Sequence, residues 1–162
     1  MAYTIRQTRR EDWRQLRELR LAALQDPVAP VAFYEPYEEA VRLTRGDWER
    51  RASGGRRVTF IGETEDGVWG GMVGAYVRDG MVYVIGVYML PEHRGTGLAR
   101  ELMIAAIEWA GGQEVRLRVH ENNPRAARFY ASLGFRPTGE TDTDPRDPAL
   151  HAYELALRTV TG

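Results

Sequence analysis

The stretch PEHRGTGLARELM, residues 91–103, joins a proline and two glycines directly to an apolar, helix-forming segment. Residues 97–110 carry apolar side chains at helical spacing, and Gly111-Gly112 predicts the helix end. A helix N-terminus has unpaired N–H groups and the positive end of the helix dipole, and glycines let an anion approach those groups closely. The stretch therefore predicts a phosphate-binding turn followed by a helix.

The sequence before this turn predicts an antiparallel sheet. Residues 56–90 contain Asp66-Gly67 and Asp79-Gly80 between runs of β-branched and aromatic residues, which is typical of two consecutive hairpins and three strands. Further towards the N-terminus, the patterns predict a strand over 3–8, an amphipathic helix over 10–24, and an irregular segment over 25–55 with a short helix around Trp48.

The sequence after the helix predicts a strand over 114–120 and a second helix. Asn123 is a good N-cap, Pro124 fits the first helical position, and Gly134 can adopt the left-handed conformation after the helix end. Strands over 135–141 and 151–160 follow, joined by an acidic loop. The whole chain, residues 1–162, is predicted to be one α/β (α+β) domain with a mixed, mainly antiparallel sheet flanked by helices.

Composition excludes several classes of function. The chain has no cysteine, so disulfides, thiolate metal sites and a cysteine nucleophile are excluded. The net charge of -1, with both signs dispersed, argues against a nucleic-acid partner. No signal-like or membrane-spanning apolar segment is present, and we expect a cytoplasmic protein without a membrane partner. The three histidines show no metal-ligand spacing, so no metal is expected.

Two common phosphate-binding turns do not fit these residues. A dinucleotide-binding turn requires a third glycine where this chain has Arg100, and a Walker A loop requires a lysine, which the chain lacks. The turn instead resembles that of the GCN5-related N-acetyltransferase (GNAT) family, in the positions of Arg94, Gly97 and Ala99. A second motif of that family is matched without a gap by Asn123, Ala126, Tyr130, Gly134 and Phe135.

The resemblance implies a fold with splayed central strands that binds acetyl-CoA. The amides of residues 94–99 would bind the pyrophosphate, with added charge from Arg94, and the preceding strand would pair with the pantetheine arm. The cofactor-binding residues implied in this way are Tyr88, Met89, Leu90, Arg94, Gly95, Thr96, Gly97, Leu98, Ala99, Asn123 and Tyr130.

Asn123 and Tyr130 are seven residues apart, which places them on one face of a helix. The resemblance implies that Asn123 holds the pantetheine or acetyl region and that Tyr130 is the general acid that protonates the leaving thiolate. A simpler interpretation of each stays open: Asn123 as a helix cap, which does not exclude cofactor contact, and Tyr130 as a core aromatic.

The general base is where the sequence departs from the family. Ile85 and Arg118 occupy the strand positions at which many relatives carry a glutamate. The base candidates that remain are Glu35 and Glu38, with their neighbour Glu39, in a segment implied to form one lip of the substrate site, and His120, followed by Glu121, at the end of a strand. Each also has a simpler interpretation, as a solvated loop residue or a strand-end histidine. A water relay, or an amine that arrives neutral, is an equally open alternative.

The function that these observations predict is acetyl-CoA-dependent N-acetyl transfer to a primary amine, by direct attack and without a metal. The acceptor would be a small molecule or a peptide amine, and the aromatic and acidic lip around Phe33 and Tyr34 favours a small cationic one. Two alternatives stay open: transfer of another acyl group, and a CoA-binding module without catalysis. A homodimer also stays open.

Overall fold

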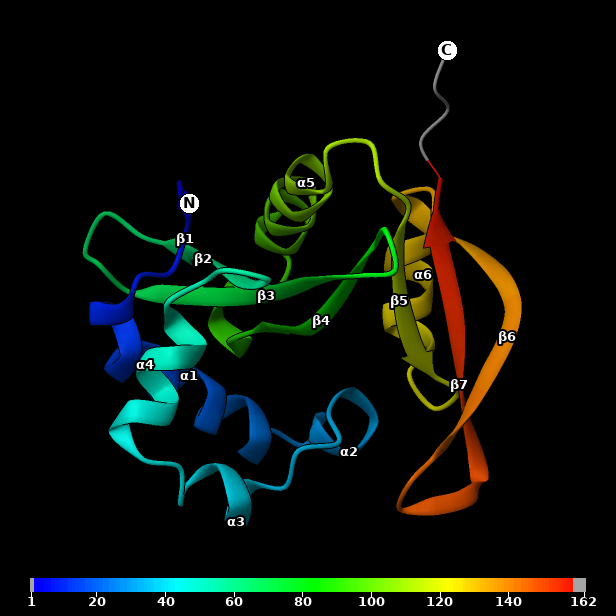
Figure 1. Ribbon diagram of the computed structural model, residues 1–162, viewed down its shortest axis with the longest axis horizontal. Helices are drawn as coiled ribbons and strands as arrows, with labels where there is room; N and C mark the ends of the chain where they lie inside the picture. The colour runs from blue at the N-terminus through cyan, green and yellow to red at the C-terminus, as the bar shows by residue number, and fades with distance from the viewer. Residues whose placement is uncertain (1, 159–162) are drawn as a thin grey trace.

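The computed structural model describes residues 2–158, and its centre is a seven-stranded sheet in the order β1-β2-β3-β4-β5-β7-β6 (Figure 1). All neighbouring strands are antiparallel except β4 and β5. The strands are β1 (Thr4–Gln7), β2 (Arg57–Glu63), β3 (Trp69–Arg78), β4 (Met81–Met89), β5 (Val115–His120), β6 (Arg136–Asp144) and β7 (Asp147–Leu157). The predicted fold class is confirmed. The last two residues of the strand predicted over 151–160 lie outside the described chain.

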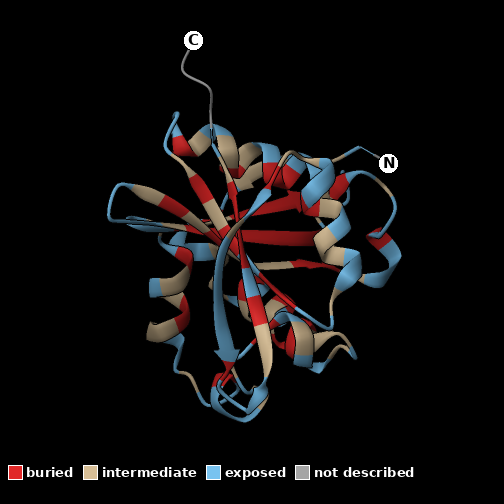
Figure 2. Cartoon of the chain, turned by 90° about the vertical axis from the view of Figure 1, so that its right-hand side faces the viewer, coloured by how far each residue is buried: buried red, intermediate tan, exposed pale blue. Residues whose placement is uncertain are grey.

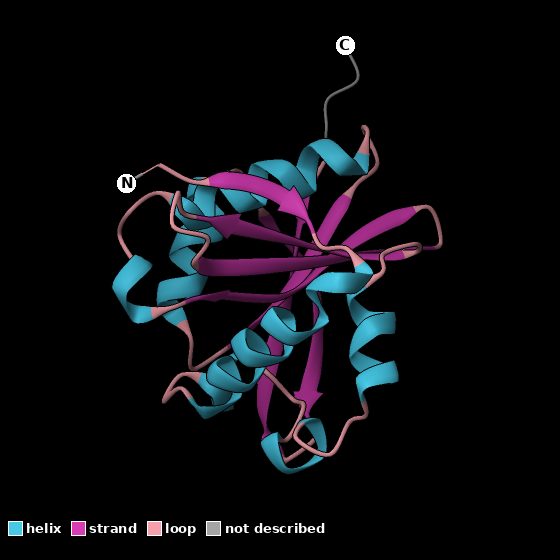
Figure 3. Cartoon of the chain, turned by 90° about the vertical axis from the view of Figure 1, so that its left-hand side faces the viewer, coloured by secondary structure: helices cyan, strands magenta, loops and turns pink. Residues whose placement is uncertain are grey.

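Helices cover both faces of the sheet, with the N-terminal helices on one face and α5 on the other (Figures 1 and 3). Buried side chains of α5 and α6 pack against one face around Leu102 and Val73, while α1 and α4 pack against the opposite face around Trp48 and Ile61. Figure 2 shows the buried positions concentrated along the central strands. The helices are α1 (Trp13–Gln25), α2 (Ala29–Ala32), α3 (Tyr37–Ala40), α4 (Arg45–Ala52), α5 (Leu98–Ala110) and α6 (Pro124–Ser132), with 3₁₀ turns η1 (Arg10–Asp12) and η2 (Pro91–His93).

The predicted turns and helix ends are confirmed where the local chemistry was specific. Asp79 and Gly80 both have positive φ, at 52° and 74°, as a tight hairpin turn requires. The Asn123 side chain accepts a hydrogen bond from the Ala126 N–H, and Gly134 has φ 101° after α6. The segment over 25–55 contains α2 and α3 besides the predicted helix around Trp48. These one-turn helices were missed because they are too short to show periodicity.

The predicted acidic loop over 142–150 is wrong. β6 and β7 continue through most of it and turn at residues 145–146, with Asp142 opposite Ala152 and Asp144 opposite Asp147. Ion pairs with arginines offset the acidic character, as in the pair between Arg146 and Asp144. Pairing in a long hairpin therefore outweighs the composition that is typical of a loop.

The parallel strands β4 and β5 separate soon after they meet. They pair only at Val82↔Val115 and Tyr83↔Arg116. Further along β4, the register with β3 shifts between Met72 and Gly74, so that two residues, Gly86 and Val87, lie opposite one. Such a bulge bends a strand, and Gly86 supplies the positive φ, 60°, at this point. The bulge bends β4 where it parts from β5, and the unpaired strand edges face a cleft.

Candidate active site

The cleft has a volume of about 860 Å³ and reaches from the turn after β4 to the strands under α1 and α4. We divide it into two parts by their residues. The turn side consists of residues 94, 95 and 97–100, the separated edges of β4 and β5, and the first turns of α6. The arginine side is centred on Arg20, Glu35, Arg51 and Arg57, from α1, the α2–α3 connection, α4 and β2.

The turn side offers free backbone donors at the N-terminus of α5. Gly95 and Gly97 have φ of 74° and 89°, a conformation that strains any other residue, and a Cβ at either would meet nothing within 4 Å. Within the described chain, the amides of Gly95, Gly97, Ala99 and Arg100 have no hydrogen-bond acceptor. These free amides form a cradle whose arrangement suits an anion such as a phosphate.

Thr96 and Leu98 take different parts in this turn. The Thr96 hydroxyl accepts from the Tyr3 hydroxyl at 3.1 Å and donates to the His93 carbonyl at 2.7 Å, so its side chain braces the loop. Leu98, the first residue of α5, is buried in the core between this helix and the sheet and also borders the cleft. Of the predicted cofactor residues, Thr96 and Leu90 do not line the cleft.

Arg94 is fixed by partners that the sequence did not reveal. Its guanidinium donates to the Met89 carbonyl at 3.1 Å and to the Asp26 carboxylate at 2.8 Å. The Tyr88 hydroxyl donates to the same Asp26 oxygen at 2.8 Å. Burial, followed by the bond to Asp26, raises the pKa of Tyr88 to about 12. Asp26 therefore anchors the start of the turn to the end of α1 and uses part of Arg94's donor capacity.

Two further arginines border the turn side. Arg100 in the first turn of α5 and Arg125 in the first turn of α6 line the cleft, and neither guanidinium has an ion-pair partner in the described chain. Both positions lie at helix N-termini, where anions are favoured. They add positive charge to the cradle, and the sequence analysis did not select them as binding residues.

Asn123 and Tyr130 lie beside the gap between β4 and β5. Asn123 caps α6 through its side-chain oxygen and also lines the cleft, so the two interpretations of this residue are compatible. Tyr130 is only 7% exposed, with its ring packed near Phe135, yet it borders the cleft. Burial raises the pKa of Tyr130. Its hydroxyl, which has no hydrogen-bond partner among the described residues, therefore stays protonated at neutral pH.

Glu35 lies on the arginine side, but two guanidinium groups surround it. Its Oε1 accepts from Arg20 at 3.0 Å and from Arg51 at 3.1 Å, and its Oε2 accepts from Arg51 at 2.6 Å. Burial acts to raise the pKa of Glu35, but the hydrogen bonds and charges of Arg51 and Arg20 outweigh it and lower the pKa. A carboxylate held in this way is a weak proton acceptor.

Arg57 lies in a row of side chains across three strands. The row is set by the pairs Arg57↔Tyr76 and Tyr76↔Tyr83, and the two tyrosine rings stack at 5.4 Å. Loss of bulk water around the guanidinium, followed by the charge of Arg51, lowers the pKa of Arg57. Within the described chain, the Arg57 side chain has no hydrogen bond or ion pair.

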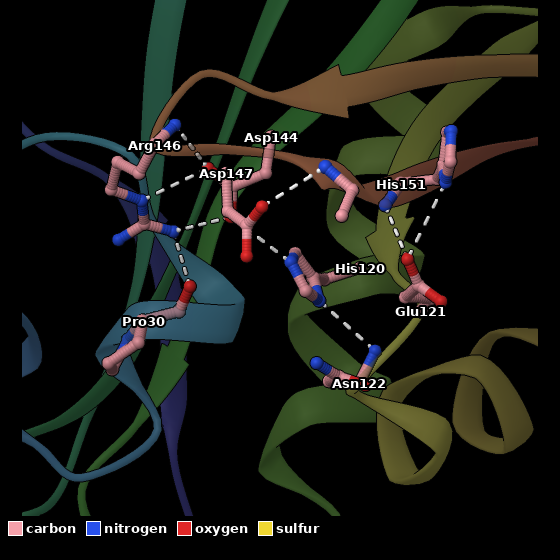
Figure 4. Close-up of polar contacts among 9 residues, drawn as sticks. Pro30, His120, Glu121, Asn122, Asp144, Arg146, Asp147 and His151 are labelled. Carbon is pink, nitrogen blue, oxygen red and sulfur yellow. Dashed lines mark hydrogen bonds and ion pairs between the residues drawn. The ribbon is translucent and has the colours of Figure 1, made fainter.

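His120 is buried at the end of β5, and both of its ring nitrogens are occupied (Figure 4). Nδ1 accepts the Asn122 N–H at 3.0 Å, and Nε2 lies 3.1 Å from the Asp144 carboxylate. The first bond requires a lone pair on Nδ1, so Nε2 carries the proton and donates to Asp144. His120 therefore holds the β6–β7 hairpin and has no free nitrogen to accept a proton.

Arg146 extends the same network to the other side of the cleft. Its guanidinium binds Asp144 and the Pro30 carbonyl of α2 (Figure 4). It also lies 5.3 Å from the Tyr34 ring centre. The hydrogen bonds from Arg146, first from its side chain and then from its backbone, lower the pKa of Asp144 to about 2. This contact ties the loop after α1 to the β6–β7 hairpin.

Glu38, the third base candidate, is exposed on α3 and does not line the cleft. Among residues 2–158, no three His, Asp or Glu side chains are grouped to hold a metal. No helix in that range is long and apolar enough to cross a membrane.

Several residues of the cleft were not predicted from the sequence, for different reasons. A glycine inside a strand often marks a bulge, so Gly86 is a signal from which the bulge in β4 could be predicted. Arg20, Arg51 and Arg57 gave no such sign, because arginines at these positions also fit a solvated surface. Asp26 gave none either, since its partner Tyr88 is 62 residues away in the sequence.

The comparisons with known proteins agree with this geometry. The model of the acetyltransferase (GNAT) family matches residues 11–135, and the chain belongs to this family. The fold is similar to that of a GCN5-related N-acetyltransferase from Kribbella flavida, with a TM-score of 0.74 at 22% identity over 98% of both chains. It is also similar to the PaiA N-acetyltransferase from Thermoplasma acidophilum in complex with coenzyme A, with a TM-score of 0.74 at 20% identity over 95% of this chain and 98% of that one.

A curated relative matches over a shorter region. The chain is 49% identical to a mycothiol acetyltransferase of Thermobispora bispora over 59 residues. These residues make up 35% of this chain and 19% of that protein. The chain therefore spans about a fifth of the length of this relative. The similarity supports the family assignment, but it leaves the acceptor to be argued from the site.

Proposed function

We propose that this protein transfers an acetyl group from acetyl-CoA to a primary amine. The observation that carries the proposal is the continuity of the cleft, which joins the free amides at the α5 N-terminus to the Tyr130 hydroxyl through the gap between β4 and β5. A phosphate-bearing cofactor with an extended, amide-containing arm fits such a path. Acetyl-CoA supplies an activated acetyl group, and a neighbouring fold is known with coenzyme A bound.

The residues of the turn side fit the parts of this cofactor. The amides of residues 95–100 would bind phosphate, supported by Arg100 and Arg125. The β4 edge beyond Tyr83, which has no β5 partner, offers backbone donors and acceptors to the arm as an added strand would. Tyr130 would hold its proton on the hydroxyl oxygen and deliver it to the leaving sulfur. A thiolate kept from water is a stronger base than one in solution, which favours that transfer.

Direct attack by the amine fits the residues that line the cleft. The lining contains no cysteine, serine or lysine that could carry the acetyl group. The base candidates are also poorly placed, since Glu35 is held by arginines and His120 has no free nitrogen. The three guanidinium groups of Arg20, Arg51 and Arg57 offer another route. Positive charges disfavour the ammonium form, so they lower the pKa of a bound amine and raise its neutral, nucleophilic fraction. The proton would then leave to water.

Thiol release from acetyl-CoA with a panel of amines tests the proposal. Acetyl-CoA should also stabilise the protein by about 3 kcal/mol at 100 times its dissociation constant, whereas NAD should not. Stabilisation without thiol release from any amine would favour the non-catalytic CoA-binding alternative. A shift with NAD and none with acetyl-CoA would contradict the cofactor assignment.

If no protein base acts, kcat/KM should rise with pH until the amine is fully neutral in solution. A plateau well below the pKa of the free amine would instead show that a residue of the protein takes the proton. The preference for acetyl over longer acyl groups is tested in the same assay with propionyl-CoA and butyryl-CoA.

A further inference from the structure

The arginine side of the cleft has more positive than negative charge. Arg20, Arg51 and Arg57 carry three positive charges, because guanidinium groups stay protonated at any ordinary pH. Glu35 is the one carboxylate that lines the cleft in the described chain, so two positive charges are in excess. The sequence predicts an acidic lip for a cationic amine, but the net charge of the arginine side is positive.

Arg20 and Arg51 are fixed in place before any ligand binds. Glu35 holds Arg51 through two hydrogen bonds and Arg20 through one. Arg20 lies 4.8 Å from the Phe33 ring centre, and Arg51 lies 4.9 Å from that of Trp48. Such stacking fixes the plane of each guanidinium. The cost of ordering these side chains is therefore met by the fold and not by the ligand.

Arg57 is the arginine whose donors are left for a ligand. Within residues 2–158 its side chain has no carboxylate, carbonyl or hydroxyl partner, although it borders the cleft beside Arg51. A guanidinium presents a planar fork of N–H donors that matches a carboxylate or phosphate. Arg57 is exposed at the edge of the cleft, so an anionic group of a ligand can reach its donors directly.

The position of this group relative to the reacting centre is also set by the sheet. The row Thr59↔Gly74↔Ile85 adjoins the bulge, and the row that starts at Arg57 is the next one on the same face. Successive residues on one face of a strand are about 7 Å apart. Arg20 reaches the bulge itself, since a Cβ at Gly86 would lie 3.7 Å from Arg20 Nη1. The fork of Arg57 is thus within reach of a small acceptor whose amine lies at the gap.

We infer that the acceptor is a small amine that also carries an anionic oxygen group, a carboxylate or a phosphate, and that Arg57 binds this group. The inference rests on the proposed function, because it takes the arginine side as the acceptor site. An amino-acid-like molecule satisfies it, whereas a polyamine would bring positive charge to a site that already has an excess.

Matched pairs of amines test the inference. Each α-amino acid, and each ω-amino acid from β-alanine to 6-aminohexanoate, is compared with its own carboxamide, and O-phosphoethanolamine with ethanolamine. The anionic member of a reacting pair should have the higher kcat/KM by about 10- to 100-fold, the range expected for a hydrogen bond to a charged group. The phosphate pair distinguishes the two sources of anion. Preference for the carboxamides, or for diamines of the same length, would overturn the inference.

Arg57→Gln should remove most of that preference, mainly through a higher KM for the anionic member of each pair, whereas the dissociation constant of acetyl-CoA should hardly change. Arg56→Gln is the matched control, because both arginines are exposed but only Arg57 lines the cleft. A preference that survives in Arg57→Gln would show that Arg57 does not bind the anion.

A second measurement does not need a reacting amine. Phenylglyoxal labels free guanidinium groups, and peptide mass spectrometry resolves Arg57 from Arg56. In the CoA-bound protein, glutarate or inorganic phosphate should slow the labelling of Arg57, compared with chloride at the same ionic strength, and leave Arg56 unchanged. If no amine reacts, the transferase proposal fails, yet protection of Arg57 would still support the anion site. Equal labelling in all three salts would overturn it.

Discussion

The turn side and the arginine side of the cleft are built in different ways. The turn side comes from residues 84–130, which are close in the sequence, and it presents backbone amides, glycines and unpaired strand edges. The arginine side combines side chains from α1, the α2–α3 connection, α4 and β2, held by the contacts of Glu35 with Arg20 and Arg51. Backbone groups suit a cofactor that is always the same, whereas side chains can change with the acceptor. The comparison predicts that variants on the two sides affect different kinetic parameters.

The largest effect is expected from Gly97→Val on the turn side. A branched side chain would fill the space above the free amides and strain a backbone with φ 89°. We expect the stabilisation by acetyl-CoA, about 3 kcal/mol at 100 times the dissociation constant, to disappear. Thermal melting with and without acetyl-CoA measures it.

Gly80→Val is the matched control, because Gly80 also has positive φ and open space but lies in the β3–β4 turn. It should be destabilised to a similar extent and keep the acetyl-CoA shift. A normal shift in folded Gly97→Val would place the phosphates elsewhere.

Tyr130→Phe should lower kcat about 100-fold or more, because the hydroxyl is removed while the ring and its packing remain. Acetyl-CoA affinity and melting temperature should hardly change. Steady-state kinetics with an acceptor found in the amine panel measure the effect, and single-turnover kinetics verify that chemistry limits the rate. An unchanged chemical rate with a lower melting temperature would assign Tyr130 to the core alone.

Glu35→Gln distinguishes a base from a structural clamp on the arginine side. If Glu35 only positions Arg20 and Arg51, kcat should stay within a few-fold and the pH profile should keep its shape. The free energy of unfolding should fall by about 1–2 kcal/mol, less than for a fully buried ion pair because these side chains are partly exposed.

Denaturant titration measures the free energy of unfolding of Glu35→Gln, and pH–rate profiles measure its kcat. Glu38→Gln, outside the cleft, should change neither the free energy of unfolding nor kcat. A loss of kcat by 100-fold together with the loss of a pH-dependent step would make Glu35 the base.

The smallest effect concerns Asp144, which binds His120 and Arg146 at the end of the β6–β7 hairpin. Its pKa of about 2 in the folded protein lies below the ordinary 3.8. The ionised carboxylate therefore stabilises the fold fully above about pH 4, and this contribution is lost as the pH falls towards 2. Asp144→Asn should flatten the fall of melting temperature over that interval. Asp66→Asn, in the exposed β2–β3 turn, should give a curve parallel to the wild type. The same acid dependence in Asp144→Asn and the wild type would exclude this contribution.

Much of the fold and of the turn side could be predicted, because the signals are local. Asp79-Gly80 adopts the turn that its chemistry favours, and Asn123 and Gly134 mark the ends of α6. The prediction was wrong over 142–150, where the loop-like composition is outweighed by pairing between β6 and β7. That pairing depends on partners that local propensity does not contain.

The sequence by itself therefore determined the class of the protein, through two motifs whose glycines, caps and helical spacing act within a few residues of each other. Only the tertiary structure decided the sign of charge on the arginine side of the cleft and the hydrogen-bond partners of each base candidate. No sequence pattern indicates that Arg20, Glu35, Arg51 and Arg57 lie together in the fold. His120 contacts Asp144 only because β5, β6 and β7 lie side by side. A charge acts through distance in space, and the folded sheet and its helices set that distance.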